Sequence, residues 1–231
     1  MSKKILIIAA HPDDEVLGCG GTIARYREKN IPVRVVFLAE GVTSRYDNIE
    51  LQSDHVINES KRRNSNAFIA LNKLSVHPDQ IFVNNRYCCR LDQVAQLDLV
   101  KEVERHISEW EPSCIYTHSP YDVNIDHRVV YQVVLAAIRP NKSSSLVEMY
   151  SFEVLSSTEW NTAKPFHANV FVDVCDFIDL KIEAMKLYKG EMYSMPHSRS
   201  EESIRSLSRY RGVQAGLEYA EAFNLIRMID K

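Results

Sequence analysis

Residues 3–15 read Lys3-Lys4-Ile5-Leu6-Ile7-Ile8-Ala9-Ala10-His11-Pro12-Asp13-Asp14-Glu15. The short run of apolar and β-branched residues at the start of this segment predicts a buried β-strand. A histidine and three carboxylates follow directly, and helical spacing takes over at Val16. Because ligands of open α/β sheets bind at the carboxyl ends of strands, the segment predicts a binding site at the end of the first strand.

Strand and helix signals alternate along the next hundred residues. Apolar runs predict strands over 33–38, 80–83 and 113–117, and apolar residues at helical spacing predict helices over 17–29, 59–71, 91–110 and 128–138. This alternation is typical of a parallel sheet with right-handed crossovers. Farther along, strands are predicted over 147–152 and 168–172, a helix over 177–187 and a helical tendency from Glu201 to Met228. No repeat or linker interrupts the pattern, so we predict one α/β domain over residues 1–231.

Composition narrows the classes of protein that fit. The 231 residues are 45% hydrophobic and 26% charged, as in ordinary globular proteins. A net charge of −3 does not indicate the excess of basic residues that is typical of nucleic-acid binding. No apolar run is long enough to span a membrane. The five cysteines lack C-x-x-C spacing, which argues against a disulfide framework or a structural zinc site. The N-terminal apolar run is too short for a signal peptide, so we expect a cytoplasmic protein. The composition is compatible with a homo-oligomer as well as with a monomer.

A second polar cluster follows the strand predicted over 113–117. It reads His118-Ser119-Pro120-Tyr121-Asp122-Val123-Asn124-Ile125-Asp126-His127-Arg128. Clusters on two parallel strands can meet at one edge of the sheet, which would bring His11, Asp14 and His127 together. Two histidines and one carboxylate are a common ligand set of catalytic zinc. A neighbouring carboxylate, Asp126 or Asp122, would then orient a ligand histidine.

Structural roles compete with these functional ones. The acids after His11 suit a helix N-terminus, and Asn124 suits the N-cap of the helix that follows. Gly18-Cys19-Gly20-Gly21 could cradle a phosphate, but its spacing is not G-x-G-x-x-G, so we favour close packing of the helix against the sheet. Three adjacent charged groups after a buried strand are costly to desolvate without a cation or polar site to use them, which favours the metal-site hypothesis.

Three motifs together resemble the PIG-L / LmbE-like family of zinc-dependent N-deacetylases. They are Ala10-His11-Pro12-Asp13-Asp14-Glu15, then Asp122-x-Asn124-x-Asp126-His127-Arg128, and the tail Arg211-Gly212-x-x-x-Gly216-x-x-Tyr219-Ala220-Glu221-Ala222-Phe223. The resemblance implies a Rossmann-like three-layer α/β fold with a mostly parallel sheet. It also implies a hydrolase that removes the N-acetyl group from an amino sugar, whether a small glycoside, a glycoconjugate or a nucleotide-linked sugar.

The same resemblance assigns roles to individual residues. His11, Asp14 and His127 would bind Zn²⁺, or another divalent transition metal, and Asp13 would be the general base. Several family members have a histidine where this chain has Asn124. The oxyanion would therefore be held by zinc together with a donor, either Asn124 or His197.

The substrate contacts are less sharply defined by the sequence. Arg63 and Arg199 are candidates to contact hydroxyl, carboxylate or phosphate groups of the substrate. Three other functions compete with sugar deacetylation: an amidase acting on a non-sugar or thiol-conjugate amide, a carbohydrate-binding homologue without turnover, and a nucleotide-binding module built on Gly18–Gly21. The intact Asp13 argues against the binding protein, which needs no base.

Overall fold

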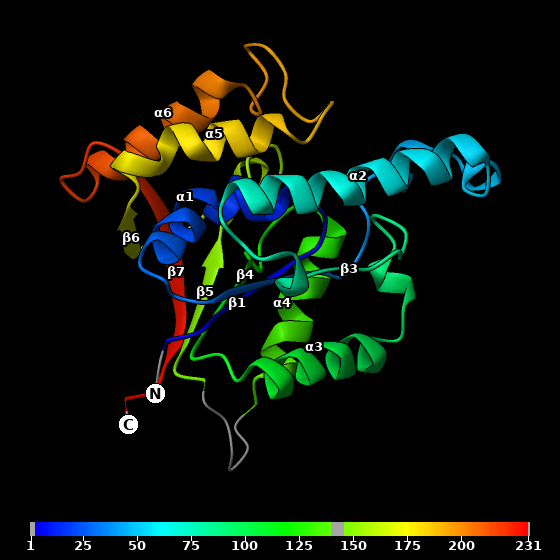
Figure 1. Ribbon diagram of the computed structural model, residues 1–231, viewed down its shortest axis with the longest axis horizontal. Coiled ribbons are helices and arrows are strands. Elements are labelled where there is room, and N and C mark those ends of the chain that lie inside the picture. The colour runs from blue at the N-terminus through cyan, green and yellow to red at the C-terminus, as the bar shows by residue number, and fades with distance from the viewer. Residues whose placement is uncertain (1–2, 140–145, 231) are drawn as a thin grey trace.

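The computed structural model describes residues 3–139 and 146–230 and contains one seven-stranded sheet with helices on both faces (Figure 1). The strands lie in the order β3-β2-β1-β4-β5-β7-β6. Their bounds are β1 (Ile5–Ala9), β2 (Val33–Phe37), β3 (Ile81–Val83), β4 (Cys114–His118), β5 (Glu148–Phe152), β6 (Val170–Asp173) and β7 (Ala220–Met228). From β3 to β5 all neighbours are parallel, and β7 is antiparallel to β5 and β6. The predicted α/β class and mostly parallel sheet are confirmed.

Two layers of helices cover the sheet. On one face lie α1 (Asp14–Glu28), α2 (Asp54–Lys73), α5 (Ile178–Lys186) and α6 (Glu201–Val213). On the other face lie α3 (Gln96–Trp110) and α4 (Ile125–Ala137). Strand β1 is buried on both sides, with Ile7 in the first core and Leu6 and Ile8 in the second. This double burial is the reason that its sequence is continuously apolar rather than alternating.

The connections place a crevice at the carboxyl ends of β1 and β4. After β1 the chain moves outward to β2 and β3, and α3 then carries it back to β4 on the other side of β1. Where the order of winding reverses in this way, the loops after the two central strands separate and leave room for a ligand. The two polar clusters singled out in the sequence follow these two strands.

The helical tendency predicted from Glu201 to Met228 is wrong beyond α6. That helix ends at Val213, Gly216 adopts a positive φ of 71°, and residues 220–228 form β7. The segment contains alanine, leucine, glutamate and methionine, which are good helix formers in isolation. Pairing on both sides, with β5 and β6, overrides that local preference because it satisfies the backbone groups of the segment inside the sheet.

A break in α1 explains the glycines after the His-Pro-Asp-Asp turn. Cys19 has φ −149°, which is not helical, and the amides of Gly21 and Thr22 donate to the Glu221 carboxylate at 2.9 and 2.7 Å. The ammonium of Lys181 donates both to Glu221 and to the carbonyl of Leu17. Backbone groups at the break are therefore paired by two buried charged side chains rather than by water.

The same glycines allow α1 to lie close to its neighbours. A Cβ atom at Gly18 would overlap the ring of Phe152 in β5, and one at Gly21 would lie 2.8 Å from Val174. Side chains of the protein thus fill the space around Gly18 and Gly21. This supports the packing interpretation of the glycines and argues against a phosphate cradle there.

Candidate active site

Three side chains from the two clusters meet at the crevice. His11 and Asp14 come from the turn after β1, and His127 comes from the first turn of α4, which follows β4. The turn is held by Asp14, whose backbone amide donates to the carbonyl of His11 at 3.2 Å and whose carboxylate accepts from the amide of His11 at 2.9 Å. Asp13 adopts a positive φ of 118°, a strained conformation for a residue with a side chain. All four residues are buried.

His11, Asp14 and His127 have the geometry of a metal site. Their ligand atoms lie within 4.8 Å of one another. Asp14 Oδ2 is 3.4 Å from Nδ1 of His11 and 3.3 Å from Nε2 of His127. Although it is buried, His127 Nε2 has no hydrogen-bond partner within the described residues. Because an orphaned buried nitrogen is costly, its placement facing a carboxylate and a second imidazole fits a bound cation.

Each ligand histidine is oriented by its own carboxylate. Asp126 Oδ2 lies 2.9 Å from Nε2 of His11, and Asp122 Oδ2 lies 3.1 Å from Nδ1 of His127. The sequence left Asp126 and Asp122 as alternatives for one such role, and in the structure each lies beside a different histidine. Such outer carboxylates fix the ring and its tautomer, so that the opposite nitrogen faces the ion.

Charge within the cluster also fits a cation. Burial disfavours the charged form of His127, but Asp14 and Asp122 outweigh that cost and raise the pKa of His127 to about 9. Burial likewise opposes the charge on His11, yet Cys88, followed by Asp126 and Asp14, raises the pKa of His11 well above its usual range. Positive charge is therefore favoured at this position. A divalent ion would supply it and release the protons.

Asp13 lies beside the ligand set without belonging to it. Its Oδ2 accepts from a guanidinium nitrogen of Arg63 at 2.5 Å and from one of Arg199 at 2.7 Å. Arg63 also donates through Nε to the carbonyl of Pro12 at 2.8 Å. Glu191 pairs with both arginines. The carboxylate predicted to be the general base is thus held in place by the two arginines that were candidates for substrate contact.

Comparison with known proteins agrees with this geometry. The profile of the PIG-L family (GlcNAc-PI de-N-acetylase) matches residues 6–138, more than half of the chain. The chain belongs to the PIG-L family. Diacetylchitobiose deacetylase of Thermococcus kodakarensis is 24% identical over 97% of this chain and 83% of that protein. The uncharacterized deacetylase YaiS of Escherichia coli is 30% identical over 81% of this chain and 91% of that protein.

A solved structure shares the fold. N,N′-diacetylchitobiose deacetylase from Pyrococcus horikoshii superimposes with a TM-score of 0.78 at 20% identity, over 97% of this chain and 84% of that one. The Rossmann-like three-layer arrangement implied by the sequence motifs is therefore confirmed. In the PIG-L chain described here, the matched region contains β1, β4 and the first turn of α4, and so all three members of the ligand set.

Two residues that support the PIG-L site were not identified from their spacing. The carboxylate of Glu15 accepts from the amide of Asp13 at 2.9 Å and from the hydroxyl of Tyr188 at 2.5 Å. Burial raises the pKa of Glu15 to about 8. Glu15 therefore braces the strained backbone of Asp13 from inside the core. The sequence signals were the position of Glu15 in the acidic run after His11 and a weaker match of Tyr188 to the family pattern, and neither indicated that the two side chains meet.

The candidate oxyanion donors, Asn124 and His197, have other contacts in the structure. Asn124 is the N-cap of α4 and accepts from the amide of Asp126 at 2.9 Å, so its capping role is real. His197 is exposed, packs on Tyr193 with ring centroids 4.2 Å apart, and accepts from the amide of Arg199 at 3.0 Å. None of these contacts reaches the ligand set, and the oxyanion role of either residue stays a prediction.

His118 supports the PIG-L ligand set from behind. Its Nε2 accepts from the amide of Ala10 at 2.8 Å, and its ring stacks on His127 at a centroid distance of 3.9 Å. Burial lowers the pKa of His118 well below its usual range, so the ring is neutral against the cation site.

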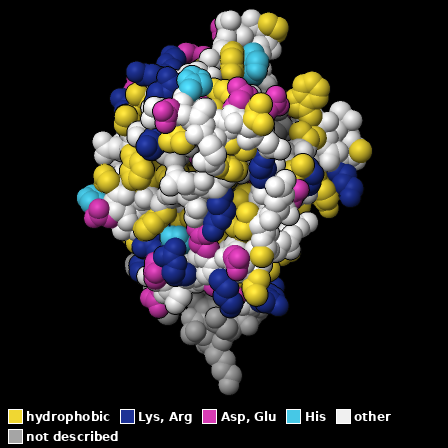
Figure 2. Space-filling model, turned by 90° about the vertical axis from the view of Figure 1, so that its right-hand side faces the viewer, with side chains coloured by type: hydrophobic (Ala, Val, Ile, Leu, Met, Phe, Trp, Pro, Cys, Tyr) yellow, Lys and Arg dark blue, Asp and Glu magenta, His cyan; other side chains and the backbone are white. Residues whose placement is uncertain are grey.

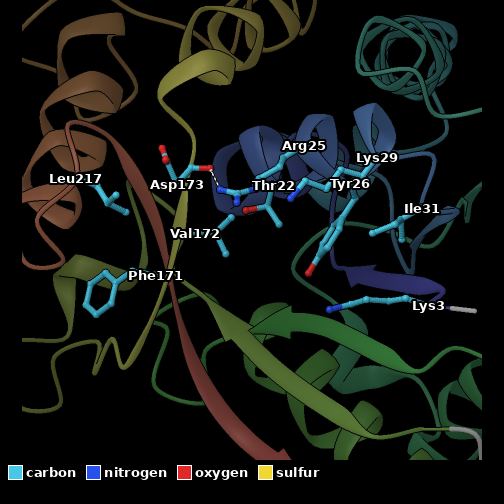
Figure 3. A pocket seen from close by; sticks show the side chains of 10 residues that line it. All are labelled: Lys3, Thr22, Arg25, Tyr26, Lys29, Ile31, Phe171, Val172, Asp173 and Leu217. Atoms are coloured by element: carbon cyan, nitrogen blue, oxygen red, sulfur yellow. Dashed lines mark hydrogen bonds between the residues drawn. The ribbon is translucent and has the colours of Figure 1, made fainter.

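A separate hollow of about 410 Å³ lies between α1 and β6 (Figure 3). Within it, Arg25 donates to the carbonyl of Asp173 at 2.5 Å. It is lined by Lys3, Thr22, Arg25, Tyr26, Lys29, Ile31, Phe171, Val172, Asp173 and Leu217. None of the candidate catalytic, substrate or metal residues is among them, so this hollow is not the candidate site.

The surface charge and the polarity of the helices are relevant to the expectation of no nucleic-acid partner and no membrane span. On the face shown in Figure 2, lysine and arginine side chains are interspersed with aspartate and glutamate and do not form one basic stripe. Among residues 3–139 and 146–230, no helix combines the length and the apolar character that crossing a bilayer requires.

Proposed function

We propose that the protein is a metal-dependent hydrolase that removes the N-acetyl group from an N-acetylated amino sugar. Membership of the PIG-L family and the similarity to a diacetylchitobiose deacetylase support this reaction. The observation that carries the proposal is the placement of Asp13, a buried carboxylate beside His11 and Asp14 but outside the ligand set. A site that only binds a cation has no use for such a group.

The chain provides a role for each side chain near the crevice. We propose that His11, Asp14 and His127 hold Zn²⁺ or another divalent transition metal, which when bound polarises the amide carbonyl and acidifies water. Asp13 accepts the proton of the attacking water and returns it to the leaving amine. Asp126 keeps His11 oriented.

The remaining polar groups act on the substrate. A hydrogen-bond donor on Asn124 or His197 meets the developing oxyanion. Arg63 and Arg199, which contact Asp13, also bind oxygen atoms of the substrate in this proposal. We further propose a small-molecule amino sugar as the partner rather than a nucleic acid, and the cytoplasm as the location. Self-association into a homo-oligomer is compatible with this function.

Acetate release from a panel of N-acetylated compounds tests the proposal. The panel contains N-acetylglucosamine conjugates, nucleotide-linked N-acetyl sugars and non-sugar or thiol-conjugate N-acetyl amides. We expect release from at least one sugar, and a loss of about 10²–10⁴-fold in Asp13→Asn with metal content retained. Release only from the non-sugar amides would favour the alternative amidase. Sugar binding without any release would favour the turnover-deficient homologue.

Metal analysis of the same preparations distinguishes a metal-dependent hydrolase from the nucleotide-binding module, the remaining alternative. The ligand set makes one site, so about one divalent ion per chain is expected there, and His11→Ala and His127→Ala should each lose the ion that His11, Asp14 and His127 hold together. Full occupancy in both variants would overturn the ligand assignment. Tight mononucleotide binding without metal would instead support the module built on Gly18–Gly21.

A further inference from the structure

Two adjacent cysteines lie near His11 and Asp126, in the loop that follows β3. Cys88 is buried and Cys89 is half-buried, and their sulfur atoms are 3.8 Å apart. Side chains of neighbouring residues point to opposite faces of an extended chain. Cys89 has a positive φ of 58°, which breaks this alternation and brings both thiols to one side of the loop. The loop thus presents a pair of sulfur atoms rather than one.

Buried carboxylates hold this loop in place. The amide of Cys88 donates to Glu40 at 2.9 Å, and the amide of Cys89 donates to Asp126 at 2.6 Å. Asp126 also accepts from the amide of Leu91 at 2.9 Å. The two thiols are therefore positioned by the fold before any ligand arrives, which lowers the entropy cost of binding.

We propose that Cys88, Cys89, Asp126 and His11 form a second cation site, selective for thiophilic divalent ions such as Zn²⁺ and Cd²⁺. One potential ligand atom from each of these four residues lies within 4.8 Å of the other three. Two sulfurs, one nitrogen and one oxygen match the tetrahedral preference of these ions, whereas Mg²⁺ and Ca²⁺ prefer oxygen alone. The side chains of this group are buried except that of Cys89, which leaves a route for entry.

The two cation sites share His11, and this part of the inference rests on the proposed function. A neutral imidazole has a single acceptor nitrogen, so His11 ligates one ion at a time. An ion held by the thiols also takes Asp126 away from the Nε2 atom that it now orients at 2.9 Å. Occupation of the second site therefore weakens the catalytic site, and excess thiophilic metal inhibits the enzyme.

Cadmium titration of the full-length protein tests the site directly. Metal is removed with a chelator, the thiols are kept reduced, and the ultraviolet thiolate-to-cadmium charge-transfer absorption is followed as Cd²⁺ is added. We expect a saturable band in the wild type, about half of its amplitude in Cys88→Ser and in Cys89→Ser, and none in the double variant. Cys175→Ser, a half-buried cysteine elsewhere, is the matched control and keeps the full band.

Further variants separate this site from the catalytic one. His127→Ala removes a catalytic ligand only and should keep the band, whereas His11→Ala should weaken Cd²⁺ binding at least about tenfold. Circular dichroism checks that each variant folds. A wild type without the band, or a double variant with an undiminished band, overturns the proposal. These readouts need no turnover, so a protein that releases no acetate contradicts the proposed function without deciding this one.

Discussion

Asp126 accepts a hydrogen bond from Nε2 of His11 at 2.9 Å, while Nδ1 of the same ring lies 3.4 Å from Asp14. Because a carboxylate can only accept, Nε2 carries a proton, and Nδ1 is the nitrogen that can offer its lone pair to an ion once a metal displaces the second proton. Asp126 is itself fixed by the amides of Cys89 and Leu91. Asp126, at the start of α4, thus determines which nitrogen of His11, after β1, keeps its proton.

Replacing Asp126 should weaken metal binding at the catalytic site without removing any of the three residues proposed to hold the ion there. We expect Asp126→Ala to lower metal affinity about 10–100-fold, because His11 is then free to rotate and to change tautomer. Competition with a chromophoric chelator measures the affinity. Asp92→Ala, an exposed acid near the same loop, is the control and should bind metal like the wild type. Equal affinities for the wild type and Asp126→Ala would show that packing alone orients His11.

Replacing Arg199, in the loop after α5, shows whether this arginine acts mainly on the proposed base Asp13 or on the substrate. Its guanidinium contacts Asp13 at 2.7 Å and Glu191 at 3.1 Å, and its Nε donates to Ser156 at 2.7 Å. We expect Arg199→Ala to lower kcat about tenfold or more, because Asp13 loses a charged partner that holds it. Steady-state kinetics on a confirmed substrate separates kcat from KM. A change in KM alone would instead assign Arg199 to the substrate.

Gly18 tests the packing of α1 against the sheet. A methyl group there overlaps the ring of Phe152, a buried residue at the end of β5. We expect Gly18→Ala to lower the free energy of unfolding by about 1–3 kcal/mol through overpacking. Gly20→Ala is the matched control, because its new methyl group would lie 3.1 Å from Lys181 and from Val16, a tight contact rather than the 2.3 Å overlap at Gly18, and should cost less. Urea denaturation compares them, and a reversed order would refute the packing argument.

The buried side chain of His106, which lies away from the metal site, should make the stability of the protein depend on pH. Burial, with help from Arg105 and Arg34, lowers the pKa of His106 from 6.5 to about 4. Between these values the unfolded chain binds more protons than the folded one, so stability is lost as pH falls from about 6.5 to 4. The loss is at most about 3 kcal/mol.

Urea denaturation of the metal-free protein at several pH values measures this contribution. The variant His106→Gln should lose less stability than the wild type over the same interval, because no buried imidazole resists protonation. His77→Gln, whose side chain lies at the surface, is the matched control. Identical pH profiles for the wild type and His106→Gln would show that another group causes the acid instability.

The sequence alone predicted most of the parallel half of the fold and the meeting of the three candidate metal ligands. A continuous apolar run, a His-Pro-Asp-Asp turn and amphipathic spacing are local signals, and β1, α1, β2 and β4 follow from them. The pairing of His11 and Asp14 with His127 was also predictable, because both clusters follow strands and parallel strands end at one edge of the sheet.

Only the tertiary structure decided which groups meet across long separations in the chain. Residues 220–228 became β7 because β5 and β6 lie on either side of them, against their local helical preference. The pairing of Asp126 with His11, of Arg199 with Asp13, and of Cys88 and Cys89 with His11 and Asp126 has the same origin. Local spacing has no information about such contacts, because they exist only once the sheet and its connecting loops have brought distant segments together.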